Sequence, residues 1–527
     1  MKSKNSCKDI VELKHKHIWC NKLNIRLLKV PTKIIFATVG VVSIVWFLIR
    51  VIPKPSRAAY PCMRIAFPFM SSFVIWMVSL LTSIFAFRKV KRHFNQGRII
   101  TGFLLVMVGL LAFFLSNMNS PRTTNASIVQ WYTANSPIGI ARGIHPGRVA
   151  WIHNPEMTSW DGESGFWWED SVNDQTQYDK TMQAALICLT GLKSENLAWQ
   201  AIFEYYNKQK YGVSKAYNSD EKIAIKINQN NTSSHENNNE INTSPQLLLS
   251  LLKSLINNAR VPQQNITVFD ASRFITDNIF GKCHSQFPDV IFVDHSGENG
   301  RAKSAYVEDA IPYSMDNGKL AKGLAQCLMD ADYIINMAIL KGHVGQGVTL
   351  CAKNFYGATS IHSDWRKNAH DNFDQNRDGS PRYMTFTDFL GHKDLGEKTL
   401  IFMIDAVYAN KFVNGPPSFK WQMTPFNNDW PSSLFISQDG VAIDAVGIDF
   451  LLSEFPDAPD MQYCDAYLIE SALADNPPSG TKYDPEIDGS VLKSLGVLEH
   501  WNNPIDKKYS RNLARENGIE LVYTRIN

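Results

Sequence analysis

The sequence predicts an α/β domain of three layers, with a mainly parallel sheet between two layers of helices, preceded by three transmembrane helices. Short apolar runs alternate along the chain with segments of helical spacing, as in an α/β sheet that has helices on both faces. Residues 333–340 form an apolar run typical of a strand that is buried on both faces. Long apolar segments near the N-terminus carry the transmembrane part of the prediction.

The N-terminal quarter predicts a membrane anchor. Residues 1–33 hold nine Lys and Arg against two acidic residues, and by the positive-inside rule they form a cytoplasmic tail. Three segments within 34–116 are long enough to cross a bilayer as helices, 34–51, 65–87 and 99–116. The polar stretch 117–136 is then a tether, and 137–527 an extracytoplasmic α/β domain. The localisation predicted is a multi-pass integral membrane protein.

The composition and the distribution of charge limit the classes of partner that the protein is expected to bind. The 527 residues are 44% hydrophobic and 20% charged, which suits a globular protein with a membrane part, and the net charge is only +3. The basic residues cluster beside the apolar segments, so nothing indicates nucleic-acid binding. The partners expected are the lipid bilayer and an unknown small molecule.

Within the domain, strands and helices are predicted in alternation. The strands are expected at 222–228, 266–270, 289–294, 333–340, 400–405 and 434–437, and the helices at 179–209, 247–259, 320–329, 441–454 and 466–473. The polar run 229–245 predicts a mobile loop. A cluster of Trp160, Trp167 and Trp168 either packs in the core or contacts a sugar-like or aromatic ligand.

Polar residues follow the ends of five predicted strands. Because parallel strands point their carboxyl ends the same way, these residues are expected to share one crevice. The strand ends carry Lys226 and Asn228, then Asp270 and Arg273, then Asp294 and His295, then Lys341 and His343, and finally Asp405. After the turn at 345–347 the chain returns with Lys353 and Asn354.

Four motifs resemble one known family. The stretch LKGHVGQGVTLCAKNFYG at 340–357 is similar to a signature of the domain of unknown function 362 family. Three more stretches fit that family in the same order: IAIKIN at 223–228, the Asn-Gly-Pro turn at 414–416 and QDGVAIDAV at 438–446. The resemblance covers roughly residues 138–452. It implies an α/β domain, which in some members is joined to ferredoxin modules, and it implies no general reaction.

Other motifs exclude several classes. The eight cysteines form no CxxC pair, which removes ferredoxin and zinc-ribbon modules from this chain. Residues 374–379 match the opening of a calcium loop, but Thr385 stands where a bidentate Glu is required. The histidines at 362 and 370 and Asp371 could ligate a metal together with His343 or His295, yet no metal is assigned and the cofactor is unknown. No serine-hydrolase, zincin, Walker or dinucleotide motif occurs.

Two functions from different classes follow. The first is a membrane-anchored enzyme that binds a polar or anionic small substrate in the crevice, with His343, Asp270 and Lys341 as catalytic residues. The second is a non-catalytic cell-surface module for ligand binding or assembly. In the first hypothesis the following side chains bind the substrate: Lys226, Asn228, Lys353, Asn354, Arg273 and His295.

Overall fold

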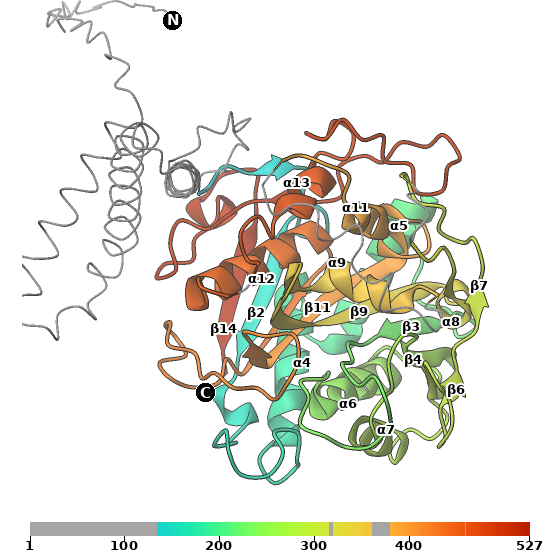
Figure 1. Cartoon of the computed structure of the whole chain (residues 1–527), viewed down its shortest axis with the longest axis vertical. Helices are drawn as coiled ribbons and strands as arrows, with labels where there is room; N and C mark the ends of the chain where they lie inside the picture. The colour runs from blue at the N-terminus through green and yellow to red at the C-terminus, as the bar shows by residue number, and fades with distance from the viewer. Residues whose placement is uncertain (1–133, 316–319, 361–379, 459, 527) are drawn as a thin grey trace, which may run out of the picture. The chain divides into compact units, whose positions relative to one another are not determined.

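A ten-stranded sheet forms the centre of the part of the chain that the computed structural model describes, residues 134–315, 320–360, 380–458 and 460–526 (Figure 1). The strands run across it in the order β14, β2, β12, β11, β9, β3, β4, β5 and β6, and β10 pairs with β9. Their bounds are β2 Arg148–His153, β3 Ile223–Lys226, β4 Ile266–Asp270, β5 Ile291–Asp294, β6 Ala302–Lys303, β9 Tyr333–His343, β10 Gly347–Thr349, β11 Thr399–Asn410, β12 Ser433–Ser437 and β14 Glu520–Arg525.

The sheet is mainly parallel, as the alternation of elements predicts. Neighbouring strands from β11 through β9, β3, β4 and β5 to β6 all pair in parallel. Only β12 and the short β10 are antiparallel to their neighbours. Two small two-stranded sheets lie outside it, β1 (Ile138–Gly139) with β13 (Val497–Leu498) and β7 (Tyr306–Val307) with β8 (Leu324–Ala325).

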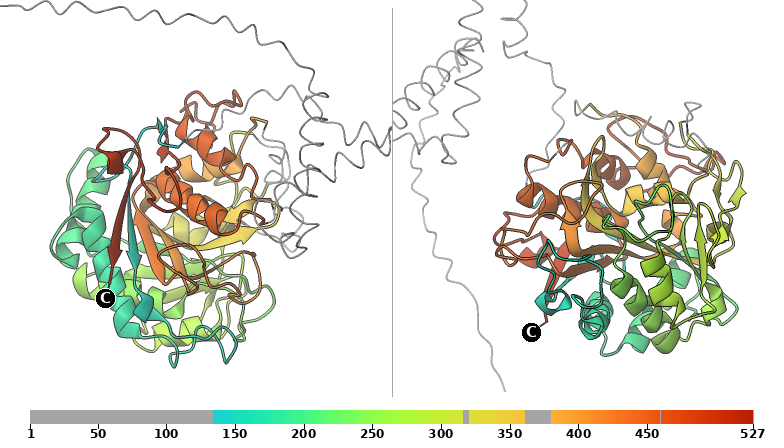
Figure 2. Two further views of the ribbon diagram at one scale, coloured as in Figure 1. Left: turned by 90° about the vertical axis from the view of Figure 1, so that its left-hand side faces the viewer. Right: turned by 60° about the horizontal axis from the view of Figure 1, so that its bottom comes forward.

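Helices cover both faces of the sheet, which makes the domain three-layered (Figures 1 and 2). Alternate residues of β9 belong to opposite cores, with Ile334 in one and Ile335 in the other. The helices α4 Gln175–Thr190, α5 Glu195–Tyr211, α6 Pro245–Lys253 and α7 Asp277–His284 pack on the core of Ile335. The helices α8 Gln326–Met329, α9 Cys351–Asn354, α11 Thr385–Gly391, α12 Gly440–Glu454 and α13 Ala466–Ala472 pack on the core of Ile334.

Local chemistry explains where two predicted helices differ from the structure. The pattern over 179–209 predicts one helix, but α4 ends at Thr190, because Gly191, with a left-handed φ of +69°, caps it. A second helix, α5, then begins after Ser194. In the region 320–329 only α8 is helical, because residues 324–325 form β8 instead.

No helix in the described ranges combines the length and the apolar character that crossing a membrane requires. The two longest there, α4 and α5, have 16 and 17 residues and carry charged side chains, whereas a span needs about 20 apolar residues. This finding contradicts the prediction of three transmembrane helices and the multi-pass localisation derived from it. The segments that carried the prediction, 34–51, 65–87 and 99–116, lie outside the described residues.

The polar run 229–245 is not the mobile loop that its composition predicts. Several of its side chains are buried, and its backbone is tied to neighbouring segments: Thr243 N donates to Asn228 O at 3.0 Å and Ile241 N to Gly415 O at 2.9 Å. Its asparagine side chains form hydrogen bonds within the run and to other segments: Asn230 Nδ2 donates to Ile241 O and Val413 O, and Asn237 Oδ1 accepts from Asn278 N.

Two of the three clustered tryptophans pack in the core, as the first of the two alternatives expects, and Trp168 is half-buried. Trp160 and Trp167 are buried and both contact Tyr408 in edge-to-face geometry. The indole N–H of Trp167 donates to Glu240 O, and that of Trp168 to Asn238 O. Two of the tryptophans therefore hold the 229–245 segment in place.

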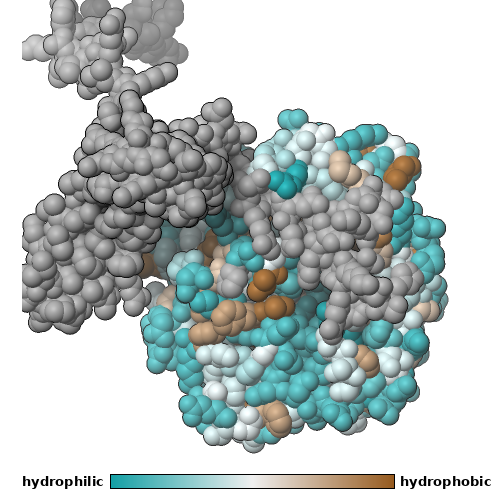
Figure 3. All heavy atoms as spheres, viewed as in Figure 1, coloured by the Kyte–Doolittle hydropathy of each residue, from teal (hydrophilic) through white to brown (hydrophobic). Residues whose placement is uncertain are grey.

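On the face seen in Figure 3 hydrophilic residues predominate and apolar ones are few and scattered. The calcium-like turn 374–379 and the histidines at 362 and 370 lie outside the described residues.

Candidate functional site

The carboxyl ends of β3, β4, β5, β9 and β11 lie along one edge of the sheet, because these five strands are adjacent and parallel. Each contributes a charged residue near its end, as the sequence predicts. The five are Lys226, Asp270, Asp294, Lys341 and Asp405. Their contacts separate them into groups with different chemistry.

Lys226 and Asp270 form a buried ion pair. The ammonium Nζ of Lys226 lies 3.1 Å from Asp270 Oδ2 and also donates to Asn354 Oδ1 at 3.2 Å. Burial lowers the pKa of Lys226, and the Asp270 carboxylate opposes that shift. Asp270 further accepts hydrogen bonds from Gln229 N at 3.1 Å and from the N–H and hydroxyl of Ser272. The carboxylate is therefore surrounded by donors, and it organises the strand ends around it.

A chain of asparagine side chains extends this pair across the sheet. The amide Nδ2 of Asn228 donates to Asn354 Oδ1 at 3.1 Å, and Asn354 Nδ2 donates to Asn336 Oδ1 at 2.8 Å. Asn336 is the one polar residue within the apolar part of β9, and it is fully buried beside Lys226 in the strand register. Each amide thus orients the next, which fixes the positions of Asn228 and Asn354.

Short helix α9, which carries Lys353 and Asn354, is held by Asp444. The carboxylate of Asp444 accepts from Cys351 N at 2.8 Å and Ala352 N at 3.0 Å, and from the Tyr467 hydroxyl. Burial raises the pKa of Asp444 to about 6 in spite of these donors. Asp444 belongs to the motif at 438–446, so this motif positions the one at 340–357, which contains α9.

Gly357 lets α9 and the turn after it approach the ion pair. A Cβ atom at this position would lie 2.7 Å from Lys226 Nζ and 2.9 Å from Asp270 Oδ1. Any side chain would therefore displace the pair, which explains a glycine at the end of the KNFYG segment in physical terms.

Lys341 is the second fully buried lysine, and its surroundings differ from those of Lys226. Its Nζ donates to Asn230 Oδ1 at 2.9 Å, and among the described residues it has no carboxylate in ion-pair distance. Burial lowers the pKa of Lys341 well below its ordinary value, and the charges of Lys353 and Arg273 lower it further. Glu240 and Asp270 oppose the shift without cancelling it.

Three buried side-chain oxygens near these lysines have no hydrogen-bond donor in the described structure. Asn228 Oδ1 and Gln229 Oε1 lie on the segment that follows β3, and Thr349 Oγ1 lies opposite Lys341 in the β9–β10 pairing. A buried polar atom without a partner carries a free-energy cost of about 1–3 kcal/mol. Such atoms are available to a bound ligand at this edge of the sheet.

The carboxylates of Asp294 and Asp405 stabilise the fold through hydrogen bonds to backbone groups. Asp294 accepts hydrogen bonds from Gly297 N at 2.7 Å and Ile275 N at 3.0 Å, and it pairs with His235 at 2.7 Å. Asp405 accepts from Ser244 N and Val407 N, and burial raises its pKa. Both carboxylates fasten loops to the strand ends.

The remaining predicted site residues lie partly exposed around this network. Arg273 donates to Ser272 O beside Asp270, and Lys353 lies 5.9 Å from the centre of the Tyr356 ring. His343 turns its Nδ1 to Val344 O, and His295 packs on Phe274. The structure thus joins Lys226, Asp270, Asn228 and Asn354 by direct contacts, and it places Arg273 and Lys353 within electrostatic reach of Lys341.

Sequence reasoning missed several residues of the site: Asn230, Glu240, Ser272, Asn336, Gly357 and Asp444. A lone Asn within the apolar run of β9 was the available signal for Asn336, because a buried polar side chain requires a partner. Asp444 and Gly357 were within recognised motifs. Glu240 accepts from Gly415 N at 2.7 Å and so brings the Asn-Gly-Pro turn to the same edge of the sheet.

The described residues contain no group of three or more His, Cys, Asp or Glu side chains with the geometry of a metal site. The five cysteines of this region are unpaired, and burial raises the pKa of the thiols of Cys283 and Cys327 to about 12. Nucleophilic chemistry at these two thiols is disfavoured on that ground.

Comparison with known proteins found a match to a family model over part of the chain. No curated protein and no solved structure matches the chain. Residues 223–449 match a family model, and this range contains β3, β4, β9, α9 and all four motifs described above. Over these residues the chain is similar to the family described as Domain of unknown function (DUF362).

Proposed function

We propose that the carboxyl-end site binds a small polar or anionic substrate, and that the chain is an enzyme in which the Lys341 amine accepts a proton. The observation that carries the proposal is Lys341 itself. It is 0% exposed, and the partner described for its Nζ is a neutral amide oxygen, Asn230 Oδ1, at 2.9 Å.

A buried ammonium without a carboxylate is costly, so burial favours the neutral form of the amine. The lowered pKa of Lys341 has this cause, together with the positive charges of Lys353 and Arg273. A neutral amine in a sheltered site is a base, and it becomes a cation when an anion arrives to pair with it. Proton acceptance by the neutral amine and ion pairing by the protonated amine both suit a polar or anionic substrate.

The neighbouring groups support the same substrate class. Lys353 and Arg273 contribute positive charge, and Asn228 is oriented by Asn354 with its Oδ1 left without a donor. Asp270 is better assigned to positioning than to proton transfer, because its carboxylate already accepts four hydrogen bonds. His343 stays a candidate at the rim of the site.

A non-catalytic binding module is the second candidate. It is favoured by the absence, in the described structure, of a proton-transfer partner at hydrogen-bond distance from Lys341: an amide such as Asn230 cannot relay a proton. In this case the same lysine binds an anion without transforming it.

The test uses the full chain incubated with a polar metabolite extract and analysed by native mass spectrometry. We expect the wild-type chain to retain a ligand that Lys341→Met loses. Lys180→Met is the matched control, because Lys180 is an exposed lysine on α4. Conversion of the retained ligand to a new mass on longer incubation supports the enzyme, and an unchanged mass supports the binding module. Equal ligand retention by Lys341→Met and wild type refutes both.

A further inference from the structure

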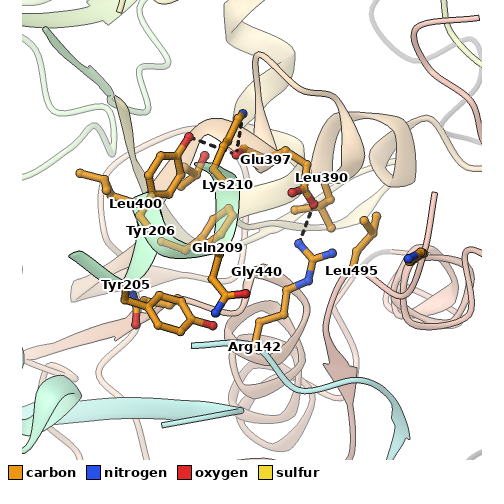
Figure 4. Close-up of a pocket in the computed structure, with 15 residues that line it drawn as sticks. Arg142, Tyr205, Tyr206, Gln209, Lys210, Leu390, Glu397, Leu400, Gly440 and Leu495 are labelled. Carbon is orange, nitrogen blue, oxygen red and sulfur yellow. Dashed lines mark hydrogen bonds and ion pairs between the residues drawn. The ribbon is translucent and has the colours of Figure 1, made fainter. Parts of the chain in front are cut away.

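A cavity of about 500 Å³ lies at the opposite end of the sheet from Lys341. Figure 4 shows the residues that line it. It opens where β11 begins, at Thr399, and at Gln438, the residue that follows the antiparallel β12. Its walls come from α5 on one face of the sheet and from α11 and the start of α12 on the other. The volume lies within the range of about 300–1,000 Å³ that is usual for small-molecule pockets.

One part of the cavity wall is apolar. Its aliphatic and aromatic side chains are those of Leu390, Leu400, Phe402, Leu495 and Tyr206. Gly440 completes this part, because a Cβ there would lie 2.9 Å from the Phe402 ring and 3.1 Å from Leu390. The absence of a side chain at Gly440 therefore lets α12 close the floor without filling the cavity.

The other part is rich in hydrogen-bond donors. The Arg142 guanidinium pairs with Glu397 at 2.6 Å and donates to Ser494 O at 2.8 Å, which fixes it at the cavity wall (Figure 4). The Tyr205 hydroxyl accepts from Gly143 N at 2.9 Å, and its own proton has no acceptor among the described residues. Figure 4 shows Tyr205 and Gln209 extending from α5 toward Arg142.

The charges of the lining are unbalanced. Arg142, Lys210 and Lys493 are cationic, and Glu397 is the single acidic residue among them. Lys210 donates to two carbonyl oxygens, and its pKa is lowered by burial. Lys493 is exposed and has no hydrogen bond or ion pair in the described part of the chain. The cavity thus has a net positive wall beside an apolar floor.

We propose that this cavity is a second ligand site, which binds a small organic acid with a compact apolar body, such as an aryl-substituted carboxylate. The carboxylate lies against Arg142, Lys493 and the Tyr205 hydroxyl, because charge-assisted hydrogen bonds are the strong ones. The apolar body lies over Phe402 and Leu495 and loses its water contacts there. The proposal is independent of the carboxyl-end site, since the two share no residue.

The test is isothermal titration calorimetry of the full chain with phenylacetate and with its uncharged isostere phenylacetamide. We expect phenylacetate to bind at least about tenfold more tightly, the factor that a charge-assisted hydrogen bond contributes. Lys493→Glu is expected to weaken phenylacetate binding by a similar factor and to leave phenylacetamide binding unchanged. Lys508→Glu, a charge reversal at an exposed lysine outside the cavity, is the matched control and keeps wild-type binding of both.

A second variant tests the location. Gln209 is exposed on α5, so Gln209→Trp fills the cavity from its rim without disturbing the core, and it is expected to abolish binding. Lys341→Met is expected to leave phenylacetate binding unchanged, which separates this site from the one at the carboxyl ends. Equal affinities for the acid and the amide, unchanged binding by Gln209→Trp, loss of binding by Lys341→Met, or no phenylacetate binding at millimolar concentration each overturn the proposal.

Discussion

The variant Lys341→Met tests directly whether the buried Lys341 amine loses its proton when the chain folds. The replacement has a similar length and no charge, so it removes the amine and its hydrogen bond to Asn230 while keeping most of the packing. The lost hydrogen bond costs about 1 kcal/mol. The variant also avoids a free-energy cost of folding, because it has no amine that must be deprotonated or buried as a cation.

The sign of the pH effect follows from linkage. The pKa of Lys341 is lowered in the folded chain, so between that pKa and the ordinary value of about 10.4 the unfolded chain binds a proton that the native chain does not. The free energy of unfolding contributed by Lys341 therefore rises with pH across this window, by about 1.4 kcal/mol per pH unit. Below the folded pKa the contribution is constant and at its most unfavourable.

Urea denaturation of wild type and Lys341→Met at several pH values between 7 and 10 measures the difference. We expect the unfolding free energy of wild type to gain on that of the variant as the pH rises toward 10, by up to about 1.4 kcal/mol per pH unit within the window between the lowered pKa of Lys341 and its ordinary value. Lys180→Met, an exposed lysine on α4, is the control and should follow wild type. Parallel curves for wild type and Lys341→Met would refute the reasoning, because they would mean that Lys341 keeps its proton in the fold.

Three further changes test the structure around the site. Lys226→Met should lower the free energy of unfolding by about 3–5 kcal/mol in urea denaturation at pH 7, because it leaves the Asp270 carboxylate buried without its cation; an effect as small as that of Lys341→Met would contradict the ion pair. Gly357→Ala should lower the melting temperature by calorimetry and reduce ligand retention, since its Cβ would lie 2.7 Å from Lys226 Nζ; wild-type values for both would exclude the close approach. Ile335→Ala, in the centre of β9, should cost about 2–5 kcal/mol of unfolding free energy through the cavity it leaves, and a cost below about 1 kcal/mol would contradict its place in the core.

The elements that sequence alone predicted well are those whose chemistry is local. Residues 266–270 form β4 as expected, and α12 begins within one residue of its predicted start because Asp439 caps it, accepting from Val441 N and Ala442 N. The apolar run at 333–340 reads as a strand buried on both faces, and β9 is one. Alternation of strands with helices was enough to predict that five strand ends share an edge.

Local sequence pattern gave wrong predictions where contacts with distant segments determine the structure. The run 229–245 is polar enough to predict mobility, yet much of it is buried, because its asparagines form hydrogen bonds within the run and to the distant residues Val413 and Asn278. The predicted transmembrane segments rested on hydropathy alone and lie outside the described residues, while the described helices are too short to span a bilayer.

The sequence by itself determined that charged and amide side chains gather at the carboxyl ends of the parallel strands, since strand direction follows from the βα alternation. Only the tertiary structure decided what each of them does. Lys226 and Lys341 stand at the same edge with the same side chain, but Asp270 pairs with the first and a neutral amide with the second. That difference arises from side chains more than 40 residues away in the chain, whose distances no local pattern encodes. The pKa of a buried lysine depends on those distances, and so does the division between a structural and a chemical role.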